Sequence, residues 1–208
     1  MAYGVRKERR RRGRKAQLLV LLAISLIAIC SVIVIWKVGE FVYDYYARFS
    51  RYDELIVKAG QRNNVDPCLI KAVIWKESRF DKRARGLKGE VGLMQIMPET
   101  GEWLAGKFGE AADYAPDRLF DANTNLRYGC WYLGYLARLF GGDMVKMAAG
   151  YHAGQNRVAR WLEDRSISPD GHTLPVDKIP FADTKQYVER VVKAHAIYQK
   201  RYWSEKAR

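Results

Sequence analysis

One glutamate lies where a predicted helix should present an apolar side chain to a protein core. Asp66-Pro67 predicts a helix start, because aspartate caps helices and proline suits the first helical position. In that helix Ile70 and Ile74 lie on one face, and Glu77 follows Ile70 by seven residues on the same face. Burial raises the pKa of a carboxyl group, and an acid still protonated near neutral pH can cleave a glycosidic bond as a general acid. The stripe alone also allows a glutamate that leans into solvent or pairs with an arginine.

The elements that would position this glutamate are helices. Glycine and proline punctuate the chain after its first 50 residues, and no run of alternating apolar residues is long enough to predict a strand. Helices are expected over residues 51–62, 67–78, 98–108, 121–140, 143–154, 156–162 and 183–203, with a loop over residues 165–182. A chain of 208 residues has room for one compact all-α domain, which we place at residues 51–208.

The basic charge of the sequence is concentrated at its N-terminus. The chain carries a net charge of +13, and residues 1–15 contribute +7 through eight lysines and arginines and one glutamate. The remaining +6 is spread over 193 residues, so charge alone indicates no class of function. Because the basic tail adjoins an apolar segment, we interpret it as a membrane topology signal and expect no nucleic-acid partner.

The apolar segment predicts a single membrane-spanning helix. Residues 18–36 are 19 positions without a formal charge, which in a helix span about 28 Å, roughly one hydrocarbon core. A cleaved signal peptide would have a shorter apolar core and a small-residue cleavage site, so the sequence favours an uncleaved transmembrane anchor over residues 16–38. The aromatic residues within positions 39–50 are typical of a juxtamembrane stalk at the headgroup level. Since lysine and arginine are retained on the cytoplasmic side, residues 1–15 should be cytoplasmic and the domain should lie outside.

The cysteines give weaker indications. Cys30 lies in the predicted anchor, whereas Cys68 and Cys130 lie in the predicted exported domain. The latter two could form a disulfide or could be small buried thiols. Their spacing does not resemble a metal site, and we expect no metal and no cofactor.

Four motifs follow one another along the predicted domain. They are Glu77-Ser78 at a helix end, GLMQIMP at residues 92–98, GYHAG at residues 150–154, and Asp183-Thr184 with Tyr187-Val188. On these motifs the sequence resembles the family 1 lytic transglycosylases, lysozyme-like enzymes that cleave peptidoglycan, over about residues 52–200. The resemblance implies a lysozyme-like transglycosylase domain with a substrate groove and with peptidoglycan glycan strands as its partner. It agrees with the predicted topology, a cytoplasmic-membrane protein with its domain on the wall side, because peptidoglycan lies outside that membrane.

The resemblance implies that Glu77 is a single catalytic acid and base. It would protonate the glycosidic oxygen between N-acetylmuramic acid and N-acetylglucosamine, and would then accept a proton from the muramic 6-hydroxyl. That hydroxyl closes onto the anomeric carbon and gives a 1,6-anhydro sugar, so neither Glu90 nor Glu99 is needed as a second carboxylate. Two alternatives are a hydrolytic muramidase and a non-catalytic module that binds the cell wall.

The resemblance also implies a set of substrate-binding side chains, each with a structural alternative. The set is Ser78, Met94, Gln95, Tyr151, His152 and Tyr187. Tyr151 is expected to hydrogen-bond near the catalytic acid, and Tyr187 to line the groove, although both could be core tyrosines with a polar tip. Met94 beside other apolar residues could belong to the core, and Ser78 could support the helix end. Gln95 could be a capping or solvated amide.

The sequence departs from the family pattern at several positions near the expected groove. His152 stands where the family usually has asparagine, and Gly150 where it has alanine. Gln155 replaces a frequent proline, Asp183 a common glutamate, and Gly86 a frequent serine. A neutral imidazole donates at one nitrogen and accepts at the other, and protonation turns both into donors. Binding at His152 could therefore be sensitive to pH. These departures concern sugar contacts more than the reaction at the glutamate.

Overall fold

The computed structural model describes residues 2–206, and within them the side chains of residues 21–22, 24–43, 47 and 49–201. The chain divides into two compact units, the first ending at Arg48 and the second beginning at Phe49.

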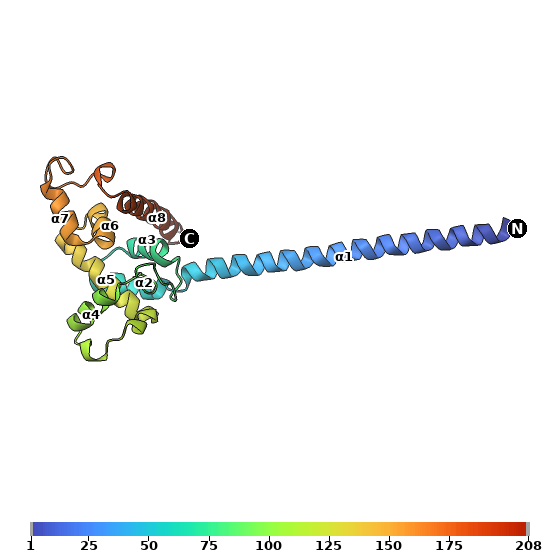
Figure 1. Ribbon diagram of the computed structural model, residues 1–208, viewed down its shortest axis with the longest axis horizontal. Helices are drawn as coiled ribbons and strands as arrows, with labels where there is room; N and C mark the ends of the chain where they lie inside the picture. The colour runs from blue at the N-terminus through green and yellow to red at the C-terminus, as the bar shows by residue number, and fades with distance from the viewer. Residues whose placement is uncertain (1, 207–208) are drawn as a thin grey trace. The chain divides into compact units, whose positions relative to one another are not determined.

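The N-terminal unit lies within one helix, α1 (Ala2–Ser50), which is drawn unbroken in Figure 1. Within it, Ile24–Tyr43 is a segment of 20 residues that is long and apolar enough to cross a membrane, and none of it is buried in the protein. This segment overlaps the predicted anchor at residues 16–38. The side chains of the basic tail at residues 1–15 lie outside the described ones, as do those of Tyr45 and Tyr46 in the predicted stalk.

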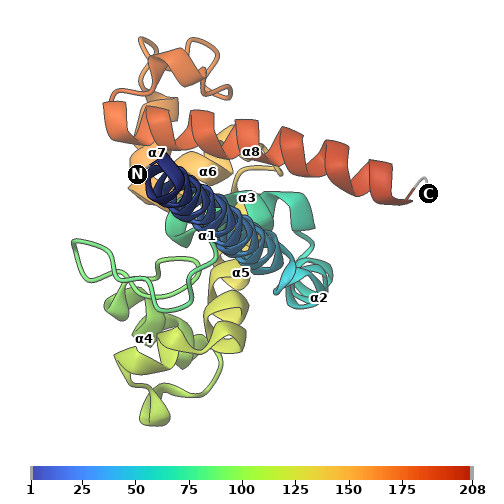
Figure 2. The same cartoon turned by 90° about the vertical axis from the view of Figure 1, so that its right-hand side faces the viewer.

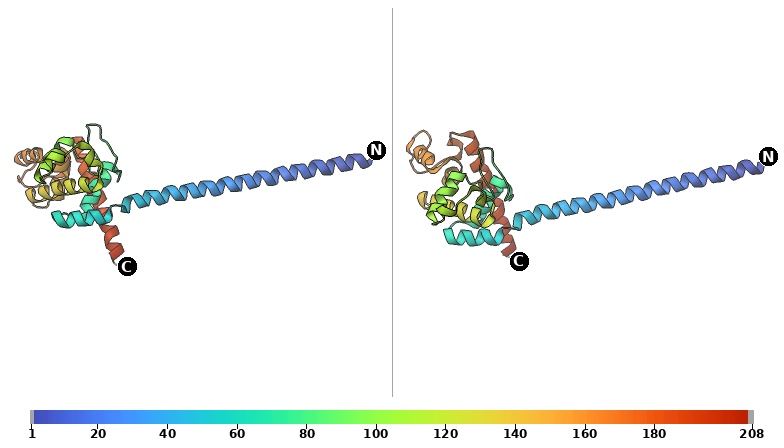
Figure 3. Two further views of the ribbon diagram at one scale, coloured as in Figure 1. Left: turned by 90° about the horizontal axis from the view of Figure 1, so that it is seen from below. Right: turned by 60° about the horizontal axis from the view of Figure 1, so that its bottom comes forward.

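The second unit is helical, which confirms the predicted all-α class. Its helices are α2 (Asp53–Asn63), α3 (Pro67–Ser78), α4 (Pro98–Lys107), α5 (Ala122–Leu139), α6 (Met144–Ala153), α7 (Gln155–Glu163) and α8 (Ala182–Lys206), with 3-10 turns η1 (Ala111–Asp113), η2 (Pro116–Phe120) and η3 (Val176–Lys178). Between residues 2 and 206 the extended pairing is limited to two isolated bridges, Arg85 with Val91 and Val91 with Ile96. Figures 1 and 3 show the long connection between α3 and α4 looping beside the helices.

Aspartate side chains begin three of the helices, as the sequence predicts. Asp66 accepts a hydrogen bond from the backbone N–H of Cys68 at the start of α3. Asp121 and Asp143 do the same at the starts of α5 and α6. Capping of this kind satisfies backbone donors that a helix leaves free, so these boundaries are fixed by local sequence.

Helix α3 lies at the centre of the second unit. It packs against α2 and α8, while α6 packs against α5, α7 and α8, and Figure 2 shows α8 crossing over α3 and α6. The predicted stripe is confirmed, because Ile70, Val73 and Ile74 are fully buried. Cys68 and Cys130 are both buried and both free, so they are core thiols in this fold.

Candidate active site

Glu77 ends the buried stripe of α3 and lies at the border between core and solvent. Its side chain is partly buried, and its Oε1 accepts a 2.7 Å hydrogen bond from the hydroxyl of Tyr187 on α8. Tyr187 is itself 1% exposed, so the donor is held rigidly by the α3–α8 packing. The carboxyl group is therefore fixed by a long-range contact rather than by its own helix.

Burial raises the pKa of Glu77 to about 7. The hydrogen bond from Tyr187 and the positive charge of Lys76 oppose this rise, and the negative charge of Glu90 adds to it. Desolvation is the larger effect on this pKa, because burial destabilises the ionised carboxylate more than one hydrogen bond from a phenol stabilises it. A substantial share of Glu77 is thus protonated at neutral pH, as a general acid requires.

The segment after α3 turns sharply and brings the GLMQ sequence back to the C-terminal end of α3. Arg79 and Phe80 both have left-handed backbone angles, with φ of 51° and 64°. Ser78 ties the two ends of this turn together, since its hydroxyl donates to the carbonyl of Leu93 at 2.7 Å. Ser78 therefore supports the helix end, which is the structural alternative considered for it, and its hydroxyl is already engaged.

Asn125, for which the sequence predicts no role, holds the same segment through hydrogen bonds from α5. Its side-chain amide donates to the carbonyls of Val91 and Leu119 at 2.9 Å and 2.8 Å, and its Oδ1 accepts from the N–H of Met94 at 2.8 Å. The side chain is fully buried on α5, so all its hydrogen bonds are made within the protein. An asparagine in a helix is a weak signal by itself, and only the tertiary pairing reveals its role.

Gln95 lies in the pocket with an unusual backbone. Its φ is 47°, and its side-chain amide donates to the carbonyls of Gly92 at 2.9 Å and Ala84 at 3.2 Å. The amide nitrogen is thereby used to close the turn, which leaves the carbonyl oxygen Oε1 as the acceptor of this side chain. Gln95 therefore both shapes the turn and lines the pocket.

Met94 lies outside the pocket, whereas Tyr151 hydrogen-bonds within the pocket that Glu77 lines. The Met94 side chain is fully buried and fills the space over Gly129, so it belongs to the core and does not line the pocket. Tyr151 donates its hydroxyl to the backbone carbonyl of Met94 at 2.8 Å. The hydroxyl that contacts Glu77 is that of Tyr187 and not that of Tyr151, because α8, not α6, packs closest to the end of α3.

His152 connects the pocket to the start of α8. Its Nδ1 lies 3.0 Å from the hydroxyl of Thr184, and its ring centre lies 4.6 Å from that of Tyr187. Desolvation lowers the pKa of His152, while the charge of Asp183 opposes the change. Burial therefore favours the neutral form of this imidazole.

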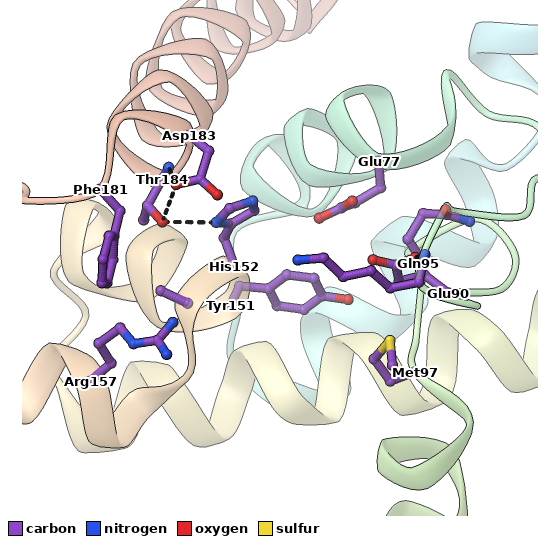
Figure 4. Close-up of a pocket in the computed structure, with 12 residues that line it drawn as sticks. Glu77, Glu90, Gln95, Met97, Tyr151, His152, Arg157, Phe181, Asp183 and Thr184 are labelled. Carbon is purple, nitrogen blue, oxygen red and sulfur yellow. Dashed lines mark hydrogen bonds between the residues drawn. The ribbon is translucent and has the colours of Figure 1, made fainter.

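These side chains meet around a pocket of about 410 Å³. It is lined by Glu77, Lys88, Glu90, Gln95, Met97, Tyr151, His152, Ala153, Arg157, Phe181, Asp183 and Thr184. Figure 4 shows Glu77, Glu90 and Gln95 at one end and Arg157 with Phe181 at the other. Within the described residues, no cluster of three histidine, cysteine or acidic side chains is placed to hold a metal ion.

The sequence of this domain matches a known protein family. The family model described as Transglycosylase SLT domain matches residues 54–172. The chain belongs to this family. It is 30% identical to the soluble lytic murein transglycosylase of Escherichia coli strain K12 over 148 residues, which are 71% of this chain and 23% of that protein. It is 36% identical to membrane-bound lytic murein transglycosylase F of Desulfosudis oleivorans over 103 residues, 50% of this chain and 20% of that protein.

A solved structure of similar fold comes from the same family. It is an inactive glutamate-to-glutamine mutant of lytic transglycosylase Slt from Pseudomonas aeruginosa, with a TM-score of 0.65 and 31% sequence identity. The match covers 74% of this chain and 24% of that structure. The chain thus spans about a quarter of the length of its soluble relatives.

Within the SLT-domain fold, the departure at Gly86 is coupled to the position of Glu90. A Cβ atom on Gly86 would collide with Oε2 of Glu90 and would crowd Oε1 of Gln95. The Glu90 carboxylate occupies this space and accepts a 2.9 Å hydrogen bond from the backbone N–H of Lys88. Glycine at residue 86 therefore makes room for a second carboxylate in the pocket, which the sequence analysis had set aside as unnecessary.

Proposed function

We propose that this chain is a membrane-anchored lytic transglycosylase, which cleaves the β-1,4 bond between N-acetylmuramic acid and N-acetylglucosamine in peptidoglycan without consuming water. The observation that carries the proposal is the state of Glu77. Its pKa of about 7 allows it to hold a proton at neutral pH, and it faces a pocket large enough for a sugar. The Tyr187 hydroxyl occupies Oε1 and leaves Oε2 to carry that proton.

One carboxyl group can perform both proton transfers of this reaction. Glu77 first donates its proton to the glycosidic oxygen as the bond to the anomeric carbon breaks. The resulting carboxylate then takes the proton of the muramic 6-hydroxyl while that oxygen bonds to the anomeric carbon. The product is a 1,6-anhydro sugar, and Glu77 ends protonated, ready for the next cycle.

The pocket offers positions for the remaining substrate contacts. Oε1 of Gln95 can accept from an N-acetyl or hydroxyl group, and His152, whose ring packs on the buried Tyr187, lines the same pocket. The names of the relatives support the substrate, since they are lytic murein transglycosylases. The inactive glutamate-to-glutamine mutant of the Pseudomonas aeruginosa relative is consistent with a reaction that depends on one glutamate.

The proposal includes anchoring by α1. The Ile24–Tyr43 segment is long and apolar enough to span a membrane, and a relative described as membrane-bound supports this arrangement. The basic residues at positions 1–15 should hold the N-terminus in the cytoplasm and place the SLT domain on the wall side. Protease added to intact spheroplasts should degrade the domain; protection of the domain would contradict this orientation.

A hydrolytic muramidase is the second candidate, because Glu90 lies in the same pocket as Glu77. A pair of carboxyl groups, one protonated and one ionised, is the arrangement by which many glycosidases activate water. The two reactions leave different ends on the glycan, a 1,6-anhydro sugar or a reducing sugar.

Analysis of the products tests the proposal. The full-length protein and its Glu77→Gln variant are incubated with purified peptidoglycan, and the released muropeptides are analysed by mass spectrometry. The wild type should release 1,6-anhydromuramic ends, and the variant should release none. Reducing ends alone would establish the muramidase, and equal release by both proteins would remove Glu77 from the mechanism.

A further inference from the structure

The end of the pocket opposite Glu77 carries an arginine that is held in place but not neutralised. Arg157 lies on α7, and its guanidinium centre is 5.0 Å from the ring centre of Phe181. In Figure 4 its side chain extends toward the pocket beside Phe181. Among the described residues, no carboxylate lies close enough to Arg157 to form an ion pair with it.

The aromatic support of this arginine is anchored in the core. Phe181 is 43% exposed, but its ring packs against Trp161 with 5.7 Å between ring centres. Trp161 is 6% exposed and follows Arg157 by four residues, so both lie on the same face of α7. Stacking on a supported ring limits the rotamers of an arginine and leaves the edge of its planar fork free to donate hydrogen bonds.

The acidic residue nearest to this end of the pocket faces other charges. Asp183 accepts a 2.8 Å hydrogen bond from the N–H of Thr184, and its pKa is lowered by the charge of Lys88 and by that of His152 when the imidazole is protonated. Lys88 lies on the turn that also carries Glu90, so its charge has acidic neighbours on the pocket wall. Neither Lys88 nor Arg157 forms an ion pair in the described part of the chain, and Arg157 is the one that lies beside Phe181 at the end of the pocket opposite Glu77.

We propose that Arg157 and Phe181 form a carboxylate-binding subsite that recognises the lactyl-peptide arm of the muramic acid residues. This inference rests on the proposed function, which brings a peptidoglycan strand into the pocket. A planar guanidinium matches the geometry of a carboxylate and can bind it through two parallel hydrogen bonds. The sugars bound near Glu77 are otherwise uncharged, so the carboxylates of the arm are the groups that this cation can select.

The subsite would make the protein distinguish peptidoglycan from uncharged glycans. Its carboxylate could come from the peptide stem or, where the stem has been removed, from the lactyl group itself. Three ligands separate these sources: glycan strands that carry stems, the same strands stripped by an amidase, and a β-1,4 oligomer of N-acetylglucosamine, which has no carboxylate.

Binding is measured by isothermal titration calorimetry on the full-length chain in detergent, in a Glu77→Gln background so that no turnover occurs. Arg157→Gln should weaken binding of stem-bearing strands about tenfold, the range expected for a charge-assisted hydrogen bond pair that is partly open to solvent. Arg157→Lys keeps the charge but loses the planar fork, and should give an intermediate loss. The matched control is Arg160→Gln, an exposed arginine on the same helix that does not line the pocket.

The outcomes are distinct. A loss restricted to stem-bearing strands assigns the carboxylate to the peptide, and an equal loss on stripped strands shows that the freed lactyl carboxylate occupies the same subsite; both support the subsite. Equal affinities for all three ligands in Arg157→Gln and in Arg160→Gln would overturn it, as would the same loss on the uncharged oligomer. A protein that binds these ligands as expected but forms no 1,6-anhydro product would refute the proposed function and leave the subsite standing.

Discussion

Replacing Glu77 by glutamine should make the folded protein more stable at neutral and alkaline pH while removing its activity. The folded-state pKa of about 7 lies well above the ordinary value of 4.5. Each tenfold difference in proton affinity is worth about 1.4 kcal/mol, so the gap corresponds to about 3 kcal/mol of folding free energy. Glutamine keeps the shape and an acceptor for Tyr187 but never ionises.

The sign of the effect follows from the direction of the pKa change. Below pH 4.5 the carboxyl is neutral in the folded and unfolded chains, and its contribution to stability is complete. As the pH rises from there to about 7, the unfolded chain loses this proton first, so the wild type loses about 3 kcal/mol that the variant retains. The Tyr187 hydrogen bond is stronger to the ionised carboxylate than to the acid, and this difference is already contained in the folded-state pKa of about 7.

The assay is equilibrium unfolding in urea, followed by tryptophan fluorescence, on both full-length proteins in non-ionic detergent. At about pH 8.5 the Glu77→Gln variant should exceed the wild type by about 3 kcal/mol more than it does at about pH 4.5. Glu99→Gln, at an exposed position of α4, is the control and should show no such dependence. A Glu77→Gln difference that is the same at both pH values would refute the assignment of Glu77 as a desolvated, protonated acid.

Three further substitutions test the surroundings of this carboxyl group. Tyr187→Phe removes the hydrogen bond that lowers the pKa of Glu77, so the alkaline fall of kcat/KM should move to higher pH, with roughly a tenfold loss at the optimum; an unmoved profile would contradict the contact. Glu90→Gln removes the charge that raises this pKa, so the fall should move to lower pH, and a shift in the opposite direction would exclude the electrostatic role. Asn125→Ala leaves two carbonyls and one N–H without their partner and should cost about 2–4 kcal/mol in urea unfolding. A cost below about 1 kcal/mol would show that water replaces these bonds.

The helices and the position of Glu77 could be predicted because local sequence determines them. Capping aspartates mark the starts of α3, α5 and α6, and apolar spacing of three and four residues gives the buried faces. The end of α3 follows from the same pattern. A carboxyl group on that stripe was therefore visible before any tertiary contact was known.

The contacts between segments could not be predicted from these patterns. The turn after α3 depends on left-handed angles at Arg79 and Phe80, which no glycine marks. The pairing of Tyr187 with Glu77 joins residues 110 positions apart, and the role of Asn125 requires a loop that lies 31 and 34 residues earlier. Periodicity carries no information about contacts between residues so far apart in sequence. It therefore could not predict which of Tyr151 and Tyr187 contacts Glu77.

The coupling of residues 86 and 90 illustrates the same limit. From the sequence, Gly86 indicates only a missing polar contact, and Glu90 indicates only a carboxylate that a one-acid mechanism does not need. Only the structure places the Glu90 carboxylate in the space that a side chain at residue 86 would fill. The pocket therefore contains a second carboxyl group, whose place depends on the glycine at residue 86.

The central claim is that the substrate's own hydroxyl, and not water, attacks the anomeric carbon. It is tested most directly by digesting purified peptidoglycan with the full-length protein in water enriched in heavy oxygen, followed by mass spectrometry of the new muramic acid ends. We predict 1,6-anhydro ends that contain no oxygen from the solvent. Incorporation of heavy oxygen at those ends would show that water is the nucleophile and would contradict the proposed reaction.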